Sequence, residues 1–172
     1  PMCMAGRASV YAEMDSTQRA RLGLADAYGR ARAVLDSALH DIAPTGQVQY
    51  EAGVERAYGE VATRFGDHAT AIQHLQRAQD LFGKVGHAIG VADAQLGLGS
   101  NLLEQNKPLP AVEILRLSSE FFKANDMRDM QAKALFSLHQ AQQRTGRTGE
   151  ALASLQEAFR LSDLARNDST RN

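Results

Sequence analysis

The feature that most constrains the fold of this chain is an internal repeat of 40 residues. Three segments align without a gap, and they begin at positions 57, 97 and 137 with AYGEVATRFGDHATAI, GLGSNLLEQNKPLPAV and SLHQAQQRTGRTGEAL. Small and large residues recur in fixed columns, among them the alanine column of Ala71, Ala111 and Ala151. A repeat of this length indicates a stacked architecture in which each unit contacts its neighbours. A weaker unit precedes the three clear ones.

Each unit has the pattern of two helices. Leu98 and Leu102 illustrate the helical spacing of apolar residues in the first half of a unit. The column of Gly66, Asn106 and Gly146 supplies residues that leave a helix through a left-handed conformation. The pattern predicts eight helices, at about 9–25, 28–43, 48–65, 68–84, 88–105, 108–124, 127–145 and 148–166.

Helix-start signals follow the turns between the predicted helices. We expect Asp67 or Thr148 to act as an N-cap, and Pro108 to occupy the first turn of its helix. Asn125 or Asp126 is expected to cap the helix that opens the last unit.

Composition narrows the class of protein. The chain has 172 residues, 44% of them hydrophobic and 23% charged, which is typical of one globular domain. A formal net charge of -1 disfavours binding to nucleic acid. A single cysteine, Cys3, excludes an intrachain disulfide framework, and no apolar run reaches the roughly 18 residues of a membrane span. The opening PMCMAG lacks a signal-peptide pattern, so we expect a cytoplasmic protein without membrane contact.

The order of small and large residues resembles the tetratricopeptide repeat. The resemblance rests on Leu98-Gly99, Leu102, Asn106, Ala111 and Leu115, and on their equivalents 40 residues away. It implies an all-α, right-handed solenoid of about four antiparallel helix pairs. We place the repeats at 9–46, 47–86, 87–126 and 127–166, as one domain over 9–166 with a short N-terminal segment, 1–8, and a tail, 167–172. The usual repeat has about 34 residues, so each pair gains length in its helices or its turn. His139 and Gln142 depart from the small and apolar residues of their columns.

The glycine pair in LGLGS admits two interpretations, a phosphate-binding loop or helix packing. A phosphate loop needs a preceding strand, whereas the residues before Gly97 have a helical pattern, and Gly59 repeats the feature of Gly99 one unit earlier. Packing is therefore the prediction. We expect Gly59 and Gly99 to let the second helix of the pair approach at Ala71 and Ala111, with Ala151 in the same column.

Catalytic and metal-binding patterns do not emerge. None of the five histidines pairs with another at the spacing of a helical metal site, and there is no second cysteine. No nucleophile and base stand in a recognisable motif. We expect a non-catalytic protein with neither cofactor nor metal.

In the resembled family the first helix of each pair lines a concave groove. Carried onto this sequence, that implies the groove residues Arg56, Glu60, Arg64, Asp93, Leu96, Ser100, Leu103, Lys133, Phe136, Gln140 and Arg144. The alternative is that the charged members are a solvated face. The apolar members, Leu96, Leu103 and Phe136, either line the groove or belong to the core between repeats.

The resemblance implies a protein- or peptide-binding module, the input or scaffolding region of a larger bacterial signalling protein. The alternative is a sensor that binds a peptide or small molecule in its groove. The last predicted helix carries apolar residues without a polar outer cap: Leu152, Leu155, Phe159, Leu161 and Leu164. We therefore expect either a following segment or a homodimer to cover it.

Overall fold

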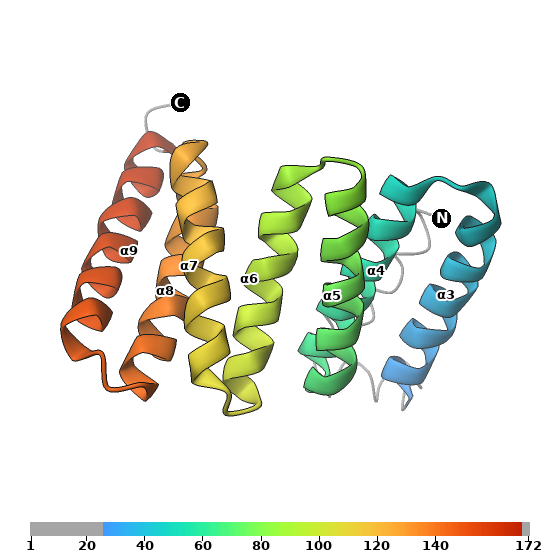
Figure 1. Cartoon of the computed structure of the whole chain (residues 1–172), viewed down its shortest axis with the longest axis horizontal. Coiled ribbons are helices and arrows are strands. Elements are labelled where there is room, and N and C mark those ends of the chain that lie inside the picture. The colour runs from blue at the N-terminus through green and yellow to red at the C-terminus, as the bar shows by residue number, and fades with distance from the viewer. Residues whose placement is uncertain (1–25, 170–172) are drawn as a thin grey trace. The chain divides into compact units, whose positions relative to one another are not determined.

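A computed structural model describes residues 26–169 of the chain, with side chains through residue 164. This part is helical throughout, which confirms the all-α prediction (Figure 1). The elements are α3 (Ala27–Ile42), a short 3-10 helix η1 (Ala43–Thr45), α4 (Val48–Arg64), α5 (His68–Lys84), α6 (Ala88–Glu104), α7 (Pro108–Ala124), α8 (Arg128–Arg144) and α9 (Thr148–Ser169). The predicted helix over 9–25 and the segment 1–8 lie outside the described residues.

The helices recur at a constant spacing. The first helices of the pairs, α4, α6 and α8, begin at residues 48, 88 and 128, and the second helices at 68, 108 and 148. From α4 to α8 every helix has 17 residues. Predicted and observed bounds differ by one residue at most, except that α9 continues to Ser169, three residues past its predicted end.

A residue with positive φ stands in each connection, at 20-residue intervals. Gly66, Asn106 and Gly146 have φ of 78°, 56° and 76°, so the predicted left-handed column is confirmed. Positive φ also occurs in the connections before α4, α6 and α8, at positions 46, 86 and 126. The residue after each position of the predicted column returns a backbone hydrogen bond to the helix just left, as the Asp67 amide does to the Ala62 carbonyl at 2.9 Å.

Of the predicted helix starts, those at Asp67 and Pro108 are correct, and the N-cap at Thr148 is not. Asp67 caps α5, because its carboxylate accepts the backbone amide of Thr70 at 3.1 Å. Pro108 opens α7, where its missing N–H costs no helical hydrogen bond. Thr148 is the first helical residue of α9 rather than its cap, and its hydroxyl donates back to the Gly146 carbonyl at 3.4 Å.

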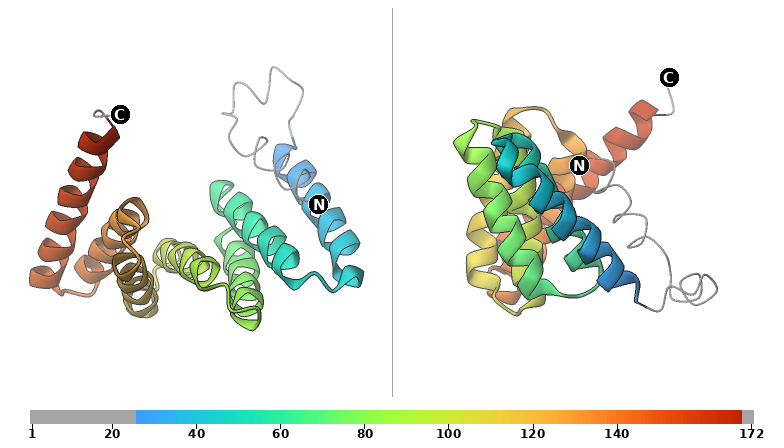
Figure 2. Two further views of the ribbon diagram at one scale, coloured as in Figure 1. Left: turned by 90° about the horizontal axis from the view of Figure 1, so that it is seen from above. Right: turned by 90° about the vertical axis from the view of Figure 1, so that its right-hand side faces the viewer.

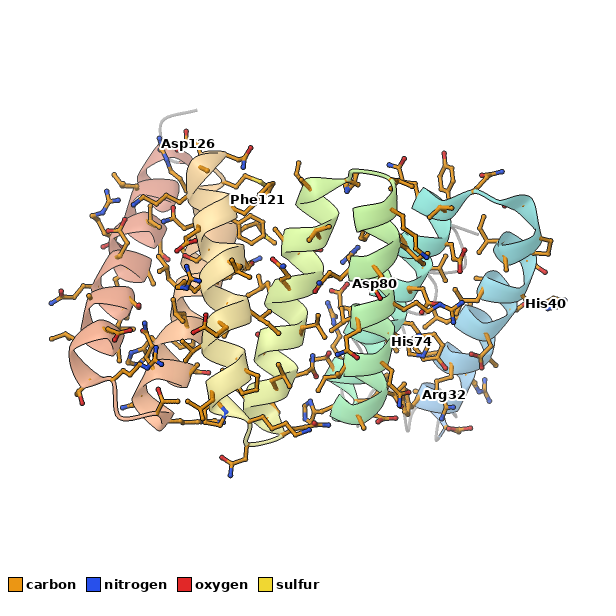
Figure 3. The ribbon with its side chains drawn as sticks, in the orientation of Figure 1. Arg32, His40, His74, Asp80, Phe121 and Asp126 are labelled. Atoms are coloured by element: carbon orange, nitrogen blue, oxygen red, sulfur yellow. The ribbon has the colours of Figure 1, made fainter. Side chains whose placement is uncertain are left out.

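The prediction that Asn125 or Asp126 caps α8 is wrong. Asp126 takes the left-handed position with φ of 53°, at the turn between α7 and α8 (Figure 3). Its carboxylate accepts a hydrogen bond from the Arg128 side chain at 3.1 Å. The Asn125 side chain donates backwards to the Phe121 carbonyl at 2.8 Å. Met127 is the residue at the cap position, without a side-chain hydrogen bond.

The chain divides into two compact units, one ending at Ala94 and the other beginning at Gln95, so α6 contributes to both. In the first unit α4 packs against α3 and α5. Its core consists of two clusters, one of Ala31, Leu35, Ala38, Val54, Tyr58 and Val61, the other of Ala52, Ala78, Leu81, Phe82 and Ala94. Burial of these apolar side chains is what holds the helices together.

In the second unit α8 lies between α7 and α9 and packs against both of them (Figure 2). A single cluster forms its core: Leu103, Ala111, Val112, Leu115, Ala132, Leu135, Leu138, Ala141, Ala158 and Leu161. Leu96 and Leu102 pack against it from α6.

Close contacts between the helices of a pair explain why Gly59 and Gly99 are glycines. A Cβ atom added to Gly59 would lie 2.5 Å from Cγ of Leu75, and one added to Gly99 would collide with Leu115. The neighbour across the pair is thus the large leucine, with the Ala71 carbonyl 3.2 Å from the added Cβ of Gly59. Gly99 lies inside α6, so the LGLGS stretch is helix and not a loop.

The last pair replaces this close contact with hydrogen bonds. His139 stands in the glycine column, and its Nδ1 lies 2.8 Å from the Ala151 carbonyl, which accepts a hydrogen bond. The buried Gln142 side chain accepts from the Ser154 hydroxyl at 2.8 Å. The two departures noted in the sequence therefore join α8 to α9.

Candidate binding surfaces

The predicted groove residues divide between the two units. Arg56, Glu60, Arg64 and Asp93 belong to the first unit; the remaining seven, from Leu96 to Arg144, belong to the second.

The first set forms a charge-balanced cluster on α4 and α6. The Arg56 guanidinium lies 3.3 Å from the Glu60 carboxylate and 3.3 Å from that of Asp93, which comes from the next pair. Arg64 reaches Glu60 at 3.2 Å from one turn further along α4. These side chains are partly exposed, and such ion pairs contribute little stability. Because the charges already pair with one another, the cluster offers a weak anchor for a charged ligand.

Four residues of the second set are committed to the core or to contacts between α6 and α8. Leu103 is 1% exposed and lies in the core, so it follows the core alternative rather than the groove. Leu96 is half-buried against the same core. The Ser100 hydroxyl donates to the Leu96 carbonyl at 3.0 Å and lies 3.2 Å from the Ser137 hydroxyl. Arg144 donates from its guanidinium to the Leu103 carbonyl.

Lys133 and Phe136 differ from these four because they border an open cavity. The cavity has a volume of about 580 Å³ and lies between α8 and α9. Its lining consists of Asp129, Ala132, Lys133, Phe136, Ser137, Leu155, Ala158, Phe159 and Ser162. Phe136 is 49% exposed and Phe159 is 61% exposed. Gln140, the last predicted residue, is half-buried and does not line it.

The chemistry of this α8–α9 cavity is apolar with two charges on one side. Ala132, Leu155 and Ala158 contribute apolar surface to the same lining as the two aromatic rings. Lys133 and Asp129 stand one turn apart on α8, are exposed, and form no ion pair within the described residues. Such a surface suits an apolar ligand segment that also carries charge. The predicted groove includes Lys133 and Phe136 but omits Asp129 and Phe159, and Phe159 is predicted instead as one of the uncapped apolar residues of the last helix.

A buried polar network in the first unit is absent from the sequence prediction. Glu55 is fully buried on α4, with His74 Nδ1 2.6 Å from one carboxylate oxygen and Arg77 Nε 2.9 Å from the other. The His74 ring stacks on Tyr58 with 3.6 Å between ring centroids. Arg32 donates to the Tyr58 hydroxyl at 3.3 Å, and Figure 3 labels Arg32 on α3 and His74 on α5. The network connects α3, α4 and α5, so its role is structural.

A second polar contact joins α3 to the start of α5. The Tyr28 hydroxyl donates to the Asp67 carboxylate at 2.9 Å. Burial acts to raise the pKa of Asp67, but hydrogen bonds from Thr70 and Tyr28 outweigh it and hold that pKa below its ordinary value. Burial and the hydrogen bond to Asp67 raise the pKa of Tyr28. The carboxylate is therefore ionised in the folded protein at neutral pH.

Within 26–169, no group of three histidine, cysteine, aspartate or glutamate side chains is placed to hold a metal ion. No described helix is long and apolar enough to cross a membrane.

Comparison with known proteins gives a family match and a fold match. Residues 50–124 match the tetratricopeptide repeat family. Two crystal structures of nearly identical TPR-like repeats from Podosopora anserina, described as kinesin light chain, share the fold. The first has 16% identity and a TM-score of 0.62 over 92% of this chain and 83% of its own. The second, a single-substitution variant of that protein, has 17% identity and a TM-score of 0.63 over 93% and 84%.

No curated protein matches the chain significantly. At such low identity the solved structures are informative about the fold alone. The chain therefore has the helical fold of TPR-like repeat proteins, with a match to the tetratricopeptide repeat family over residues 50–124.

Proposed function

We propose that this chain is a non-catalytic, protein- or peptide-binding repeat module whose partner occupies the α8–α9 cavity. The observation that carries the proposal is the pair of exposed aromatic side chains, Phe136 and Phe159, lining an apolar cavity. Exposed apolar surface bordered by charge is typical of interaction sites, and aromatic residues are enriched in them. The match to the tetratricopeptide repeat family supports a role in protein interaction.

Finer parts of the proposal rest on the resemblance to repeats of bacterial signalling proteins. We place the module in the cytoplasm, as the input or scaffolding region of a larger signalling protein that binds neither nucleic acid nor membrane. The charge cluster of Arg56, Glu60, Arg64 and Asp93 in the first unit is proposed to contribute little to binding, since its charges pair with one another.

A sensor function is the second candidate, and the size of the cavity favours it. A volume of about 580 Å³ falls within the range of small-molecule sites. A small signal bound there would raise the melting temperature as its concentration rises. A thermal-shift screen against cytosolic metabolites and short peptides tests this alternative.

Capture of partners from the source cytosol tests the proposed function. The immobilised chain is compared with Phe136→Ser and Phe159→Ser, and captured proteins are quantified by mass spectrometry. The captured amount of a partner that is held in the cavity is expected to decrease at least about tenfold with either substitution, as for interface hot spots. Leu109→Ser is the matched control, because Leu109 is an exposed apolar residue of the same unit that does not line the cavity. Equal capture by all four proteins would refute the proposal.

A further inference from the structure

α7 and α9 are each the second helix of a pair, and equivalent faces of these two helices differ in burial. With a 40-residue period, each residue of α9 from 148 to 164 has a counterpart on α7. Val112 is 2% exposed, whereas its counterpart Leu152 is 56% exposed. Ser119 is buried, whereas its counterpart Phe159 is mostly exposed. Val112 belongs to the core cluster that α7 shares with α8, whereas the same face of α9 is exposed within the described residues.

The contacts between α6 and α8 define the direction and register in which a helix packs against the first helix of the preceding pair. Ser100 on α6 lies 3.2 Å from Ser137 on α8, and Leu103 on α6 accepts from Arg144 on α8. Both residue numbers increase together, so α6 and α8 run in the same direction. In the first unit Arg56 meets Asp93 at 3.3 Å, and this pair has the same separation of 37 residues as Ser100 and Ser137.

This register identifies what Phe136 and Lys133 would meet. Arg56 is the repeat counterpart of Phe136, and its partner Asp93 is the sixth residue of α6. A helix docked on α8 in the same register therefore places its sixth residue at Phe136. One turn earlier, its third residue lies at Lys133. An acidic third residue would pair with the Lys133 ammonium and would also be favoured by the helix dipole of its own first turn.

Apolar complementarity further restricts the docked helix. On α7 the small Ser119 and the large Phe122 both lie in this face; on α9 their counterparts are the large Phe159 and the small Ser162. Size complementarity therefore favours a small residue over Phe159 and a large apolar residue toward Ser162, the reverse of what α8 meets on α7. A helix with the α8 sequence is thus expected to bind less tightly than one with these sizes exchanged. The groove selects among helices and does not accept every amphipathic one equally.

From this placement we infer that the α8–α9 cavity binds an amphipathic α-helix of a partner protein, parallel to α8, with an acidic residue in its first turn. The inference rests on the proposed function, since it names the partner of the same site. Its basis is continuity with the interface that α8 already makes within the second unit, together with the charge of Lys133.

A synthetic helix based on α8 itself serves as the probe. The peptide carries the sequence of residues 126–146 with Met130→Glu, which puts an acid at the third helical position, and a fluorescent label. Fluorescence anisotropy is measured as the full chain is titrated in. Saturable binding is expected, weakened about tenfold by Lys133→Glu in the full chain. A peptide with Met130→Lys is expected to recover that loss on the Lys133→Glu chain, because the charge pair is restored in reverse.

Controls separate the groove from other contacts. Leu117→Ser removes an exposed apolar residue of α7 that does not line the cavity, and it should leave the affinity unchanged. A peptide with Leu135→Pro cannot form a continuous helix and should not bind. Binding that Phe136→Ser and Phe159→Ser leave intact, or equal binding of the proline peptide, would overturn the inference.

Two outcomes distinguish this inference from the proposed function. If no peptide binds, yet cytosolic capture still depends on Phe136 and Phe159, the helix inference is wrong and the proposed function holds. If capture is indifferent to both residues, the proposed function itself fails. Sedimentation velocity of the full chain adds a third: a dimer that Phe159→Ser dissociates would identify a second copy as the occupant and would overturn the inference.

Discussion

At the residue scale, the residues with positive φ in the connections determine which substitutions there lower the free energy of unfolding. Gly66 has φ of 78° and no heavy atom within 4 Å of an added Cβ, so strain there is purely conformational. Gly66→Ala is expected to destabilise the chain by about 1 kcal/mol in urea unfolding. Gly83 is equally open but helical, so Gly83→Ala is expected to stabilise by about 0.5–1 kcal/mol. Equal effects of the two substitutions would exclude left-handed strain as the cause.

The hydrogen bond between Tyr28 and Asp67 predicts a pH dependence of stability. Because the pKa of Asp67 is lowered on folding, its stabilising contribution is present above the ordinary value of 3.8 and is lost as the pH falls through the folded-state pKa. Tyr28→Phe is expected to cost about 1.5 kcal/mol at pH 7, for the loss of a hydrogen bond to a charged group. The difference from wild type should shrink once Asp67 is protonated. A loss that is the same at pH 7 and in acid would show that the carboxylate is not involved.

Individual turn residues also show how far the sequence predicts local structure. Asp67 is predicted as a cap and is one, whereas Asp126 is predicted as a cap and instead takes positive φ. Aspartate suits both positions, so its identity alone does not decide between them. The 20-residue spacing of Gly66, Gly86, Asn106 and Gly146 includes position 126, and that spacing is the signal that corrects the assignment.

At the scale of elements, the contact between α6 and α7 depends on a glycine opposite a leucine. A Cβ on Gly99 would collide with Leu115, which is fully buried. Gly99→Ala is expected to destabilise by about 1–3 kcal/mol through overpacking, measured by chemical denaturation. In a Leu115→Ala background the added methyl has room, so the cost of Gly99→Ala should fall there. Gly149→Ala, at an open position of α9, is the control and should not destabilise. Additive effects of the first two substitutions would contradict direct contact.

The same scale explains why the candidate site is only partly predictable. Helical periodicity places Lys133 and Phe136 on one side of α8, where both line the cavity. Periodicity also groups Leu103 with them, although Leu103 lies in the core. A groove-facing stripe and a stripe facing the next helix share one period, so spacing alone does not separate them. Phe159 is missing from the predicted groove because it lies on a second helix, and the implied groove draws only on first helices; the sequence predicts it instead as part of the uncapped apolar face of the last helix.

At the scale of the whole molecule, the chain consists of two compact units whose boundary falls within α6. Each unit has its own core, which includes Leu35 and Tyr58 in the first and Leu115 and Leu138 in the second. In repeat proteins stability is approximately a sum of local terms, because each repeat contacts only its neighbours. A substitution that destabilises one core is therefore expected to leave the stability of the other unit unchanged.

Hydrogen exchange measured by mass spectrometry tests this expectation. Leu115→Ala removes a fully buried side chain from the second core and is expected to cost about 3 kcal/mol. Exchange should accelerate in α7, α8 and α9, while α3, α4 and α5 keep their protection. Leu35→Ala is the reciprocal variant, since Leu35 is fully buried in the first core, and it should accelerate exchange in α3 and α4 instead. If both variants accelerate exchange equally in every helix, the described part of the chain unfolds as one cooperative block. The description of stability as a sum of local terms would then fail, because damage in either unit would lower the free energy of opening in both.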